Sequence, residues 1–382
     1  MAKGKKSKSK SSQNTSQAHV QSTTAIPVCP SIGAAVAPSA PPLPNPATGS
    51  ANPAASFSAL WGYLQPALDH IVRSPTNNTA KAPAIDVAYH MGIHTAVYNY
   101  FTSQSEVGMP QHPAEKMASF AAMTAPRTDK AKASGTDLYD QLDRYYAEIA
   151  REVFLGTPHD DASLIHYLVP CFNRYSAGVR SVDRLLNYVN RHYVKRAVDE
   201  DRGWFRLTDM LDVVTKMIQE DDTREKIQTK LKEMRVQELK KWGYSEGGSP
   251  EELAQAEACA EAASKPDRIV HLVNLGYRRF RIECIEPLLT VPKTAKRNGK
   301  RNKIPSSNSQ GPQMPKGRLA RAVKELLEGQ GGDLDERRRL AGELAMLLKT
   351  VGVRFDHPLR KKLEKFCASP PPTSAPSPTP TS

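Results

Sequence analysis

Apolar residues recur with helical spacing through most of the chain, and no alternating strand pattern is sustained for long. Trp61, Leu64, Leu68 and Ile71 follow one another at intervals of three or four residues, which predicts an amphipathic first helix. We therefore predict an all-α fold, arranged as a helical bundle. The same spacing marks later helices at Leu138, Leu142, Tyr145, Ile149 and Val153, at Leu164, Leu168 and Phe172, and at Leu340, Leu344, Leu347 and Leu348.

Two of the predicted helices begin with clear capping signals. Asp160 or Asp161 can cap the helix that contains Leu164, because a carboxylate accepts hydrogen bonds from the first free backbone N–H groups. Further along, Ser249 precedes Pro250, and two glutamates follow. This order combines a serine cap with proline at the first helical position and an acidic first turn.

The helix predicted from 86 to 103 has two apolar faces instead of one. Val87, Met91, Tyr98 and Phe101 form one face, whereas Ile93, Val97 and Tyr100 form another. A helix that is apolar on two sides is either fully buried or uses one face for the core and the other for a partner.

Polar segments interrupt the helical pattern and divide the chain. Residues 1–55 and 367–382 are rich in proline and small polar residues and are predicted to be disordered. We divide the chain into a basic, Pro/Ala-rich arm (1–55), a first helical part (56–206), a charged helical insertion (207–265), a further helix (266–289), a basic disordered insertion (290–316), closing helices (317–366) and a Pro/Ser/Thr-rich tail (367–382).

The net charge of +13 lies almost entirely in two of these segments. Residues 1–55 contribute +5 and residues 290–316 contribute +7, which leaves +1 for the rest of the chain. A helical protein that contacts phosphates through these segments is the alternative function, but they lack interleaved aromatics for base stacking, so nucleic acid is a disfavoured partner. Basic runs of this kind also serve as nuclear-import signals or solubilising linkers, here at Lys5, Lys6, Lys296, Arg297, Lys300 and Arg301.

No catalytic, cofactor or membrane motif is present in the sequence. His90 and His94 have the i, i+4 spacing of a zinc motif, but its glutamate and a third ligand are missing, and the five cysteines form no CxxC pair. We expect no cofactor and no enzymatic activity. Apolar stretches are too short for a signal peptide or a membrane span, which favours an intracellular protein, cytoplasmic or nuclear.

A short stretch rich in tyrosine, asparagine, histidine and arginine stands out from this background. It can be an amphipathic helix with a basic C-terminal end, which the helix dipole favours, or a partner interface, which Tyr and Arg favour. The stretch reads Tyr188-Val189-Asn190-Arg191-His192-Tyr193-Val194-Lys195-Arg196.

This stretch closely resembles the Asn-Arg-His motif of cullins, in particular the class that scaffolds Skp–F-box ubiquitin ligases. Residues 90–103, which read His-Met-Gly-Ile-His-Thr-Ala-Val-Tyr-Asn-Tyr-Phe-Thr-Ser, are similar to the second helix of the N-terminal cullin repeat. Residues 276–289 resemble the helix after the motif, and residues 319–353 resemble the closing pair of helices. The resemblance covers most of 56–355 in the same order.

The resemblance implies a non-catalytic helical scaffold that binds a BTB-fold adaptor of the Skp class and, through it, F-box receptors. In the family, the second helix and the motif helix contact the adaptor. The family usually has tyrosines at the positions of His90 and His94, so the preferred adaptor can differ. Carried over by position, the contacting residues are His90, His94, Val97, Asn190, Tyr193 and Arg196.

The chain also departs from the family. The segments 207–265 and 290–316 are predicted to be insertions within the repeat, and no counterpart of the RING-binding part of a cullin follows residue 355. The resemblance therefore implies adaptor binding without recruitment of a conjugating enzyme, as in a competitor, a sequestering module or a degenerate paralogue. A fragment of a longer cullin gene would have the same sequence.

Overall fold

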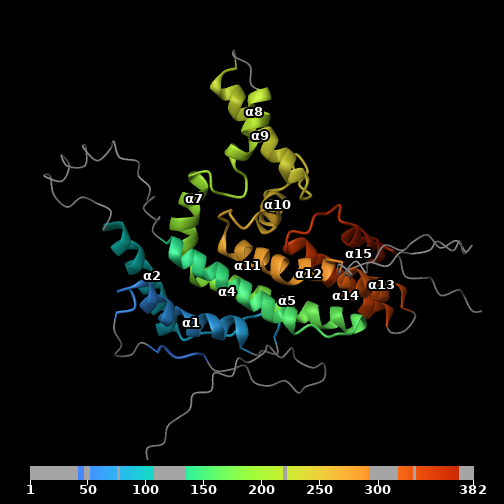
Figure 1. Ribbon diagram of the computed structural model, residues 1–382, viewed down its shortest axis with the longest axis horizontal. Coiled ribbons are helices and arrows are strands. Elements are labelled where there is room, and N and C mark those ends of the chain that lie inside the picture. Colours follow the sequence, from blue (N-terminus) through green and yellow to red (C-terminus); the bar gives the residue numbers. More distant parts are fainter. Residues whose placement is uncertain are drawn as a thin grey trace, which may run out of the picture.

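The structure, a computed structural model, describes residues 42–46, 52–74, 78–106, 135–217, 222–291, 317–329 and 333–369. Within these residues the secondary structure is helical, apart from one isolated parallel bridge between Leu43 and Ile85. The predicted all-α bundle is confirmed. The helices form an elongated body, with α2 and α7 at one end, α13 and α15 at the other, and α8 and α9 projecting from its side (Figure 1).

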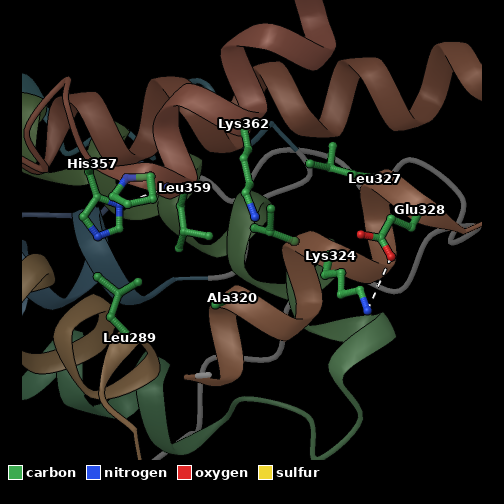
Figure 2. A pocket seen from close by; sticks show the side chains of 10 residues that line it. Leu289, Ala320, Lys324, Leu327, Glu328, His357, Leu359 and Lys362 are labelled. Atoms are coloured by element: carbon green, nitrogen blue, oxygen red, sulfur yellow. Dashed lines mark hydrogen bonds and ion pairs between the residues drawn. The ribbon is translucent and has the colours of Figure 1, made fainter. Parts of the chain in front are cut away.

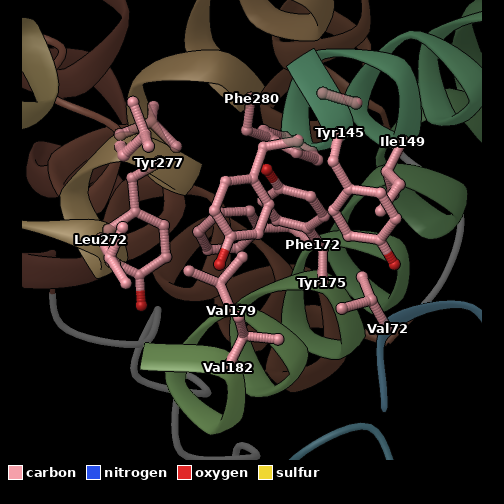
Figure 3. Packing of buried hydrophobic residues seen from close by; sticks show 14 of the residues in the cluster. Val72, Tyr145, Ile149, Phe172, Tyr175, Val179, Val182, Leu272, Tyr277 and Phe280 are labelled. Atoms are coloured by element: carbon pink, nitrogen blue, oxygen red, sulfur yellow. The ribbon is translucent and has the colours of Figure 1, made fainter. Parts of the chain in front are cut away.

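The centre of the body is built from four helices that share one hydrophobic core: α1 (Phe57–Arg73), α4 (Thr136–Leu155), α5 (Asp161–Leu185) and α11 (Leu272–Phe280). Figure 3 shows aromatic rings from α4, α5 and α11 packed between aliphatic side chains. The ring of Phe280 lies 5.0 Å from the rings of both Phe172 and Tyr175, measured between centroids. Gly276 permits the close approach of α11 to α5, because a Cβ there would lie 2.7 Å from a Val179 methyl carbon.

Polar side chains set the helix starts where the sequence predicts them. The Asp160 carboxylate accepts a hydrogen bond from the Ser163 backbone N–H at 2.9 Å, and the Ser249 hydroxyl accepts one from the Glu252 N–H at 3.2 Å. Ser56 caps α1 in the same way. Each cap satisfies a backbone donor that has no partner within its helix.

Two longer helices each contain a π-helical turn. The motif helix runs through α6 (Asn187–Val189), the π-turn η2 (Asn190–Val194) and α7 (Lys195–Asp199). The second consists of α11, the π-turn η3 (Arg281–Ile285) and α12 (Glu286–Leu289). A π-turn adds a residue to the helical repeat, so side chains after it face a different direction from those before it.

The charged segment 207–265 does not behave as one insertion. It contains α8 (Leu207–Met217) and α9 (Arg224–Lys240), which project from the body, and α10 (Pro250–Ala263), which packs against α11 and α14. Ala256, Cys259 and Ala260 on α10 are buried. The predicted insertion therefore separates into a projecting pair of helices and a third helix that belongs to the body.

The C-terminal end of the body contains α13 (Arg318–Glu328), α14 (Leu334–Thr350) and α15 (Pro358–Ala368). Gly352 follows α14 with a φ of +81°, and a Cβ at this position would lie 2.5 Å from the backbone nitrogen of Ala263. Glycine therefore allows both the left-handed turn and the close contact with α10.

The predicted arm ends earlier than residue 55. Leu43 exchanges backbone hydrogen bonds with Ala84 and Asp86, and the Asn45 side chain accepts a hydrogen bond from the Tyr63 hydroxyl at 3.1 Å. Ala54 is buried. Residues 42–46 and 52–55 therefore pack on the helical body, and they do so through backbone pairing that a proline-rich composition does not reveal.

Helix α2 (Val87–Glu106) completes the N-terminal end of the body beside α1. None of the described helices is long and apolar enough to cross a membrane.

Candidate functional site

Helix α2 turns one of its apolar faces toward the core and the other toward solvent. Ile93, Val97 and Tyr100 are buried in the core together with Tyr89, whose hydroxyl donates a hydrogen bond to the Tyr63 carbonyl. The opposite face leaves large apolar side chains in solvent. Met91 is 58% exposed, Tyr98 is 52% exposed and Val87 is 76% exposed.

The exposed face of α2 continues onto the motif helix through aromatic contacts. The Tyr188 ring lies 5.6 Å from the Tyr98 ring, in an edge-to-face arrangement, and it stacks on His192 with ring centroids 4.0 Å apart. Phe101, which the sequence places on the same helix face as Met91 and Tyr98, is buried, and its ring centroid lies 5.3 Å from that of Tyr188. We name the resulting patch the α2–α6 surface; its members are Val87, His90, Met91, His94, Tyr98, Tyr188 and His192.

The two histidines of α2 belong to this surface and are half-buried. Their rings are 4.8 Å apart. Burial lowers the pKa of His94, and the positive charge that His90 can carry lowers it further. His94 is therefore neutral at pH 7 and adds an aromatic, uncharged ring to the patch. Among the described residues, no three potential metal ligands of the His, Cys, Asp and Glu types come together, so the pair is not part of a metal cluster there.

Tyr193, a predicted contact residue, lies in the interior. Its side chain is 1% exposed and packs 5.2 Å from the Tyr139 ring. The Arg202 guanidinium donates a hydrogen bond to its hydroxyl at 2.9 Å and lies over its ring. The side chain therefore holds the motif helix against α4 and does not reach a partner.

Asn190 is also buried, and it joins two elements far apart in sequence. Its amide nitrogen donates to the Asp183 carboxylate at 2.8 Å, and its amide oxygen accepts from the Leu272 N–H at 3.0 Å. The second bond satisfies a free backbone donor at the start of α11. Asn190 thus ties the motif helix to the core, which is a structural role.

Charged groups around Asn190 complete a network between α5, α10 and α11. Burial would raise the pKa of Asp183, but its interactions with His271 and Asn190 lower it. Interaction with Asp183 raises the pKa of His271 in turn. Burial raises the pKa of Glu261, which accepts hydrogen bonds from the His271 N–H and the Asn274 side chain. These contacts fix the position of the motif helix relative to α11.

The six predicted contact residues therefore fall into two groups. His90 and His94 lie on the α2–α6 surface, and Arg196 is exposed on α7, 3.9 Å from Glu200. Val97, Asn190 and Tyr193 are buried, so the idea that their side chains touch a partner is corrected: burial assigns them to the core. The predicted import residues Lys5, Lys6, Lys296, Arg297, Lys300 and Arg301 lie outside the described residues.

Sequence reasoning missed Met91, Tyr98, Tyr188 and His192 as surface candidates. The sequence does indicate Met91 and Tyr98, because both lie on the second apolar face of α2, and in the structure both side chains are exposed. Exposed basic residues border the patch on the motif helix, namely Arg191, Lys195 and Arg196. An aromatic and aliphatic patch with a basic edge is suited to binding another protein, since aromatic residues, Met and Arg are enriched in such interfaces.

The chain is similar to a curated protein, Cullin-1 of Dictyostelium discoideum. The two are 24% identical over 149 residues, which cover 37% of this chain and 17% of Cullin-1. This chain therefore spans less than a fifth of that relative's length. No family model and no solved structure matches the chain. Together with the all-α fold, the similarity indicates a cullin-like relationship.

Proposed function

We propose that this protein is a non-catalytic, cullin-like scaffold module that binds a BTB-fold adaptor of the Skp class, and F-box receptors through it, in ubiquitin-dependent protein degradation. The observation that carries the proposal is the α2–α6 surface, an apolar and aromatic patch that spans the two helices most similar to the adaptor-binding helices of cullins. The similarity to Cullin-1 supports the same class of protein.

The geometry of the patch explains how such binding would work. Met91 and Tyr98 would be the central apolar anchors, and Tyr188 and His192 would extend the contact across the second helix. Arg191, Lys195 and Arg196 would form the charged rim, where they steer association more than they add affinity. A standard interface covers roughly 1,600 Å² in total, so the partner would extend beyond the patch itself.

Co-elution with a purified Skp-class adaptor tests the proposal. We expect one complex peak in size-exclusion chromatography when both proteins are present at about 10 μM, because complexes with dissociation constants near 1 μM, about −8 kcal/mol, persist at that concentration. Removal of residues 1–41 and 292–316 should leave the complex intact, since both segments lie apart from the α2–α6 surface in sequence. Separate elution of the two proteins would refute the adaptor role.

A further inference from the structure

A groove at the opposite end of the body from the α2–α6 surface is not explained by adaptor binding. It lies between α12, α13 and α15 and has a volume of about 310 Å³. Its apolar lining includes Leu289, Ala320, Leu327 and Leu359, and Lys324 and Lys362 stand at its edge. Figure 2 shows Leu359 and Lys362 extending from α15 toward α13. We name this site the α13–α15 groove.

The edge of the groove is positively charged. Its lining contains two lysines, Lys324 and Lys362, and one acid, Glu328. Lys324 forms an ion pair with Glu328 at 3.5 Å, whereas Lys362 forms no ion pair with any described residue. Burial lowers the pKa of His357, so this lining residue is neutral at pH 7. The groove therefore offers apolar contacts inside and an available ammonium group at the edge.

The two segments that adjoin the groove in sequence do not suit it as occupants. Residues 292–316 carry seven basic residues and no acid, so the lysines at the groove would repel them. Residues 370–382 consist of Pro, Ser, Thr and Ala, with no large apolar side chain to fill the groove. The α2–α6 surface of a second copy has no acidic member and a basic edge, so it also lacks the acidic groups that would complement Lys362.

We propose that the α13–α15 groove binds an acidic amphipathic helix of a partner protein. Aliphatic side chains one turn apart on that helix would enter the groove, and carboxylates beside them would pair with Lys324 and Lys362. The volume lies at the lower end of the ~300–1,000 Å³ range of ligand pockets, which suits a few anchoring side chains rather than a whole domain. Because the groove and the α2–α6 surface lie at opposite ends of the body, both partners can bind at once (Figure 1).

Two synthetic amphipathic peptides of about 14 residues test this proposal. Both carry leucines at positions i, i+3, i+4 and i+7; one has glutamates at the flanking positions and the other has lysines. In fluorescence anisotropy with the full chain, the Glu peptide should bind with a dissociation constant in the tens of micromolar and the Lys peptide at least tenfold more weakly. Raising the salt concentration from about 0.1 M to 1 M should weaken the binding of the Glu peptide, because salt screens exposed charges.

Matched variants locate the binding site. The double variant Lys324→Glu, Lys362→Glu should weaken the binding of the Glu peptide at least tenfold. The control variant Lys361→Glu, Lys365→Glu changes the net charge equally, but both residues lie outside the groove lining, so the affinity should be unchanged. Ala320→Phe, which fills the groove, should also weaken binding while circular dichroism stays that of wild type. Equal binding of both peptides, no binding at 500 μM, or equal effects of the two lysine pairs would overturn the proposal. Met91→Glu should not change the affinity of the Glu peptide, which would show that the groove and the adaptor site are independent.

Discussion

Replacing Tyr193 by alanine should lower the free energy of unfolding by about 3 to 5 kcal/mol, the usual cost of removing a large aromatic side chain from a core. The ring is 1% exposed and packs against Tyr139, and its hydroxyl accepts a hydrogen bond from Arg202. Truncation would leave a cavity beneath the motif helix and remove one acceptor of the Arg202 guanidinium, which would keep its ion pair with Glu200. Urea unfolding followed by circular dichroism measures the change.

Two control variants show that burial, and not the motif, causes this loss. Tyr193→Phe keeps the ring and removes only the hydrogen bond, so it should cost about 1 to 2 kcal/mol. Tyr98→Ala removes a tyrosine that is 52% exposed and should cost less than about 1 kcal/mol. If Tyr193→Ala unfolded at the same urea concentration as wild type, Tyr193 could not be a core residue and would have to be placed at the surface.

Replacing Met91 by glutamate should weaken adaptor binding at least about 30-fold, which corresponds to about 2 kcal/mol. Met91 lies on the exposed face of α2 between Val87 and Tyr98, at the centre of the proposed interface. A carboxylate buried there on association would lose its hydration without gaining a partner. The folded chain should tolerate the change within about 0.5 kcal/mol, because the side chain is in solvent.

Met346 provides a matched control for this variant. It is 55% exposed and lies on α14, toward the other end of the body. Met346→Glu makes the same chemical change and should leave the adaptor dissociation constant, measured by isothermal titration calorimetry, as in wild type. If the two glutamate variants bound the adaptor equally, whether as wild type or more weakly, the α2–α6 surface would not be the specific contact.

Helix positions and starts could be predicted from sequence because they depend on local patterns. The apolar spacing locates α1, α4 and α5, and the Asp160 and Ser249 caps act within three residues of themselves. The docking of α10 could not be predicted in the same way. Its buried face consists mainly of alanine and cysteine, which fit between helices because they are small and not because they form a strong apolar stripe.

The candidate site was predicted at the level of helices but not of side chains. Apolar spacing shows that α2 has two apolar faces, yet it cannot decide which of them meets the core. Val97 was carried over by position from the resemblance to cullins, and it is buried. Asn190 bonds to Leu272, a residue 82 positions away, and no local pattern reveals that contact. Tyr193 was also carried over by position, and it lies in the π-turn at residues 190–194, where side-chain directions depart from a regular helical repeat.

Hydroxyl-radical footprinting of the full chain with and without a saturating Skp-class adaptor tests the central claim most directly, because it reports solvent access at individual side chains. Methionine and tyrosine oxidise readily when exposed. We predict that oxidation of Met91 and Tyr98 falls when the adaptor binds, while oxidation of the exposed Met346 and Phe355 does not change. Unchanged oxidation of Met91 and Tyr98, or protection of Met346 and Phe355 instead, would contradict the placement of the adaptor site on the α2–α6 surface.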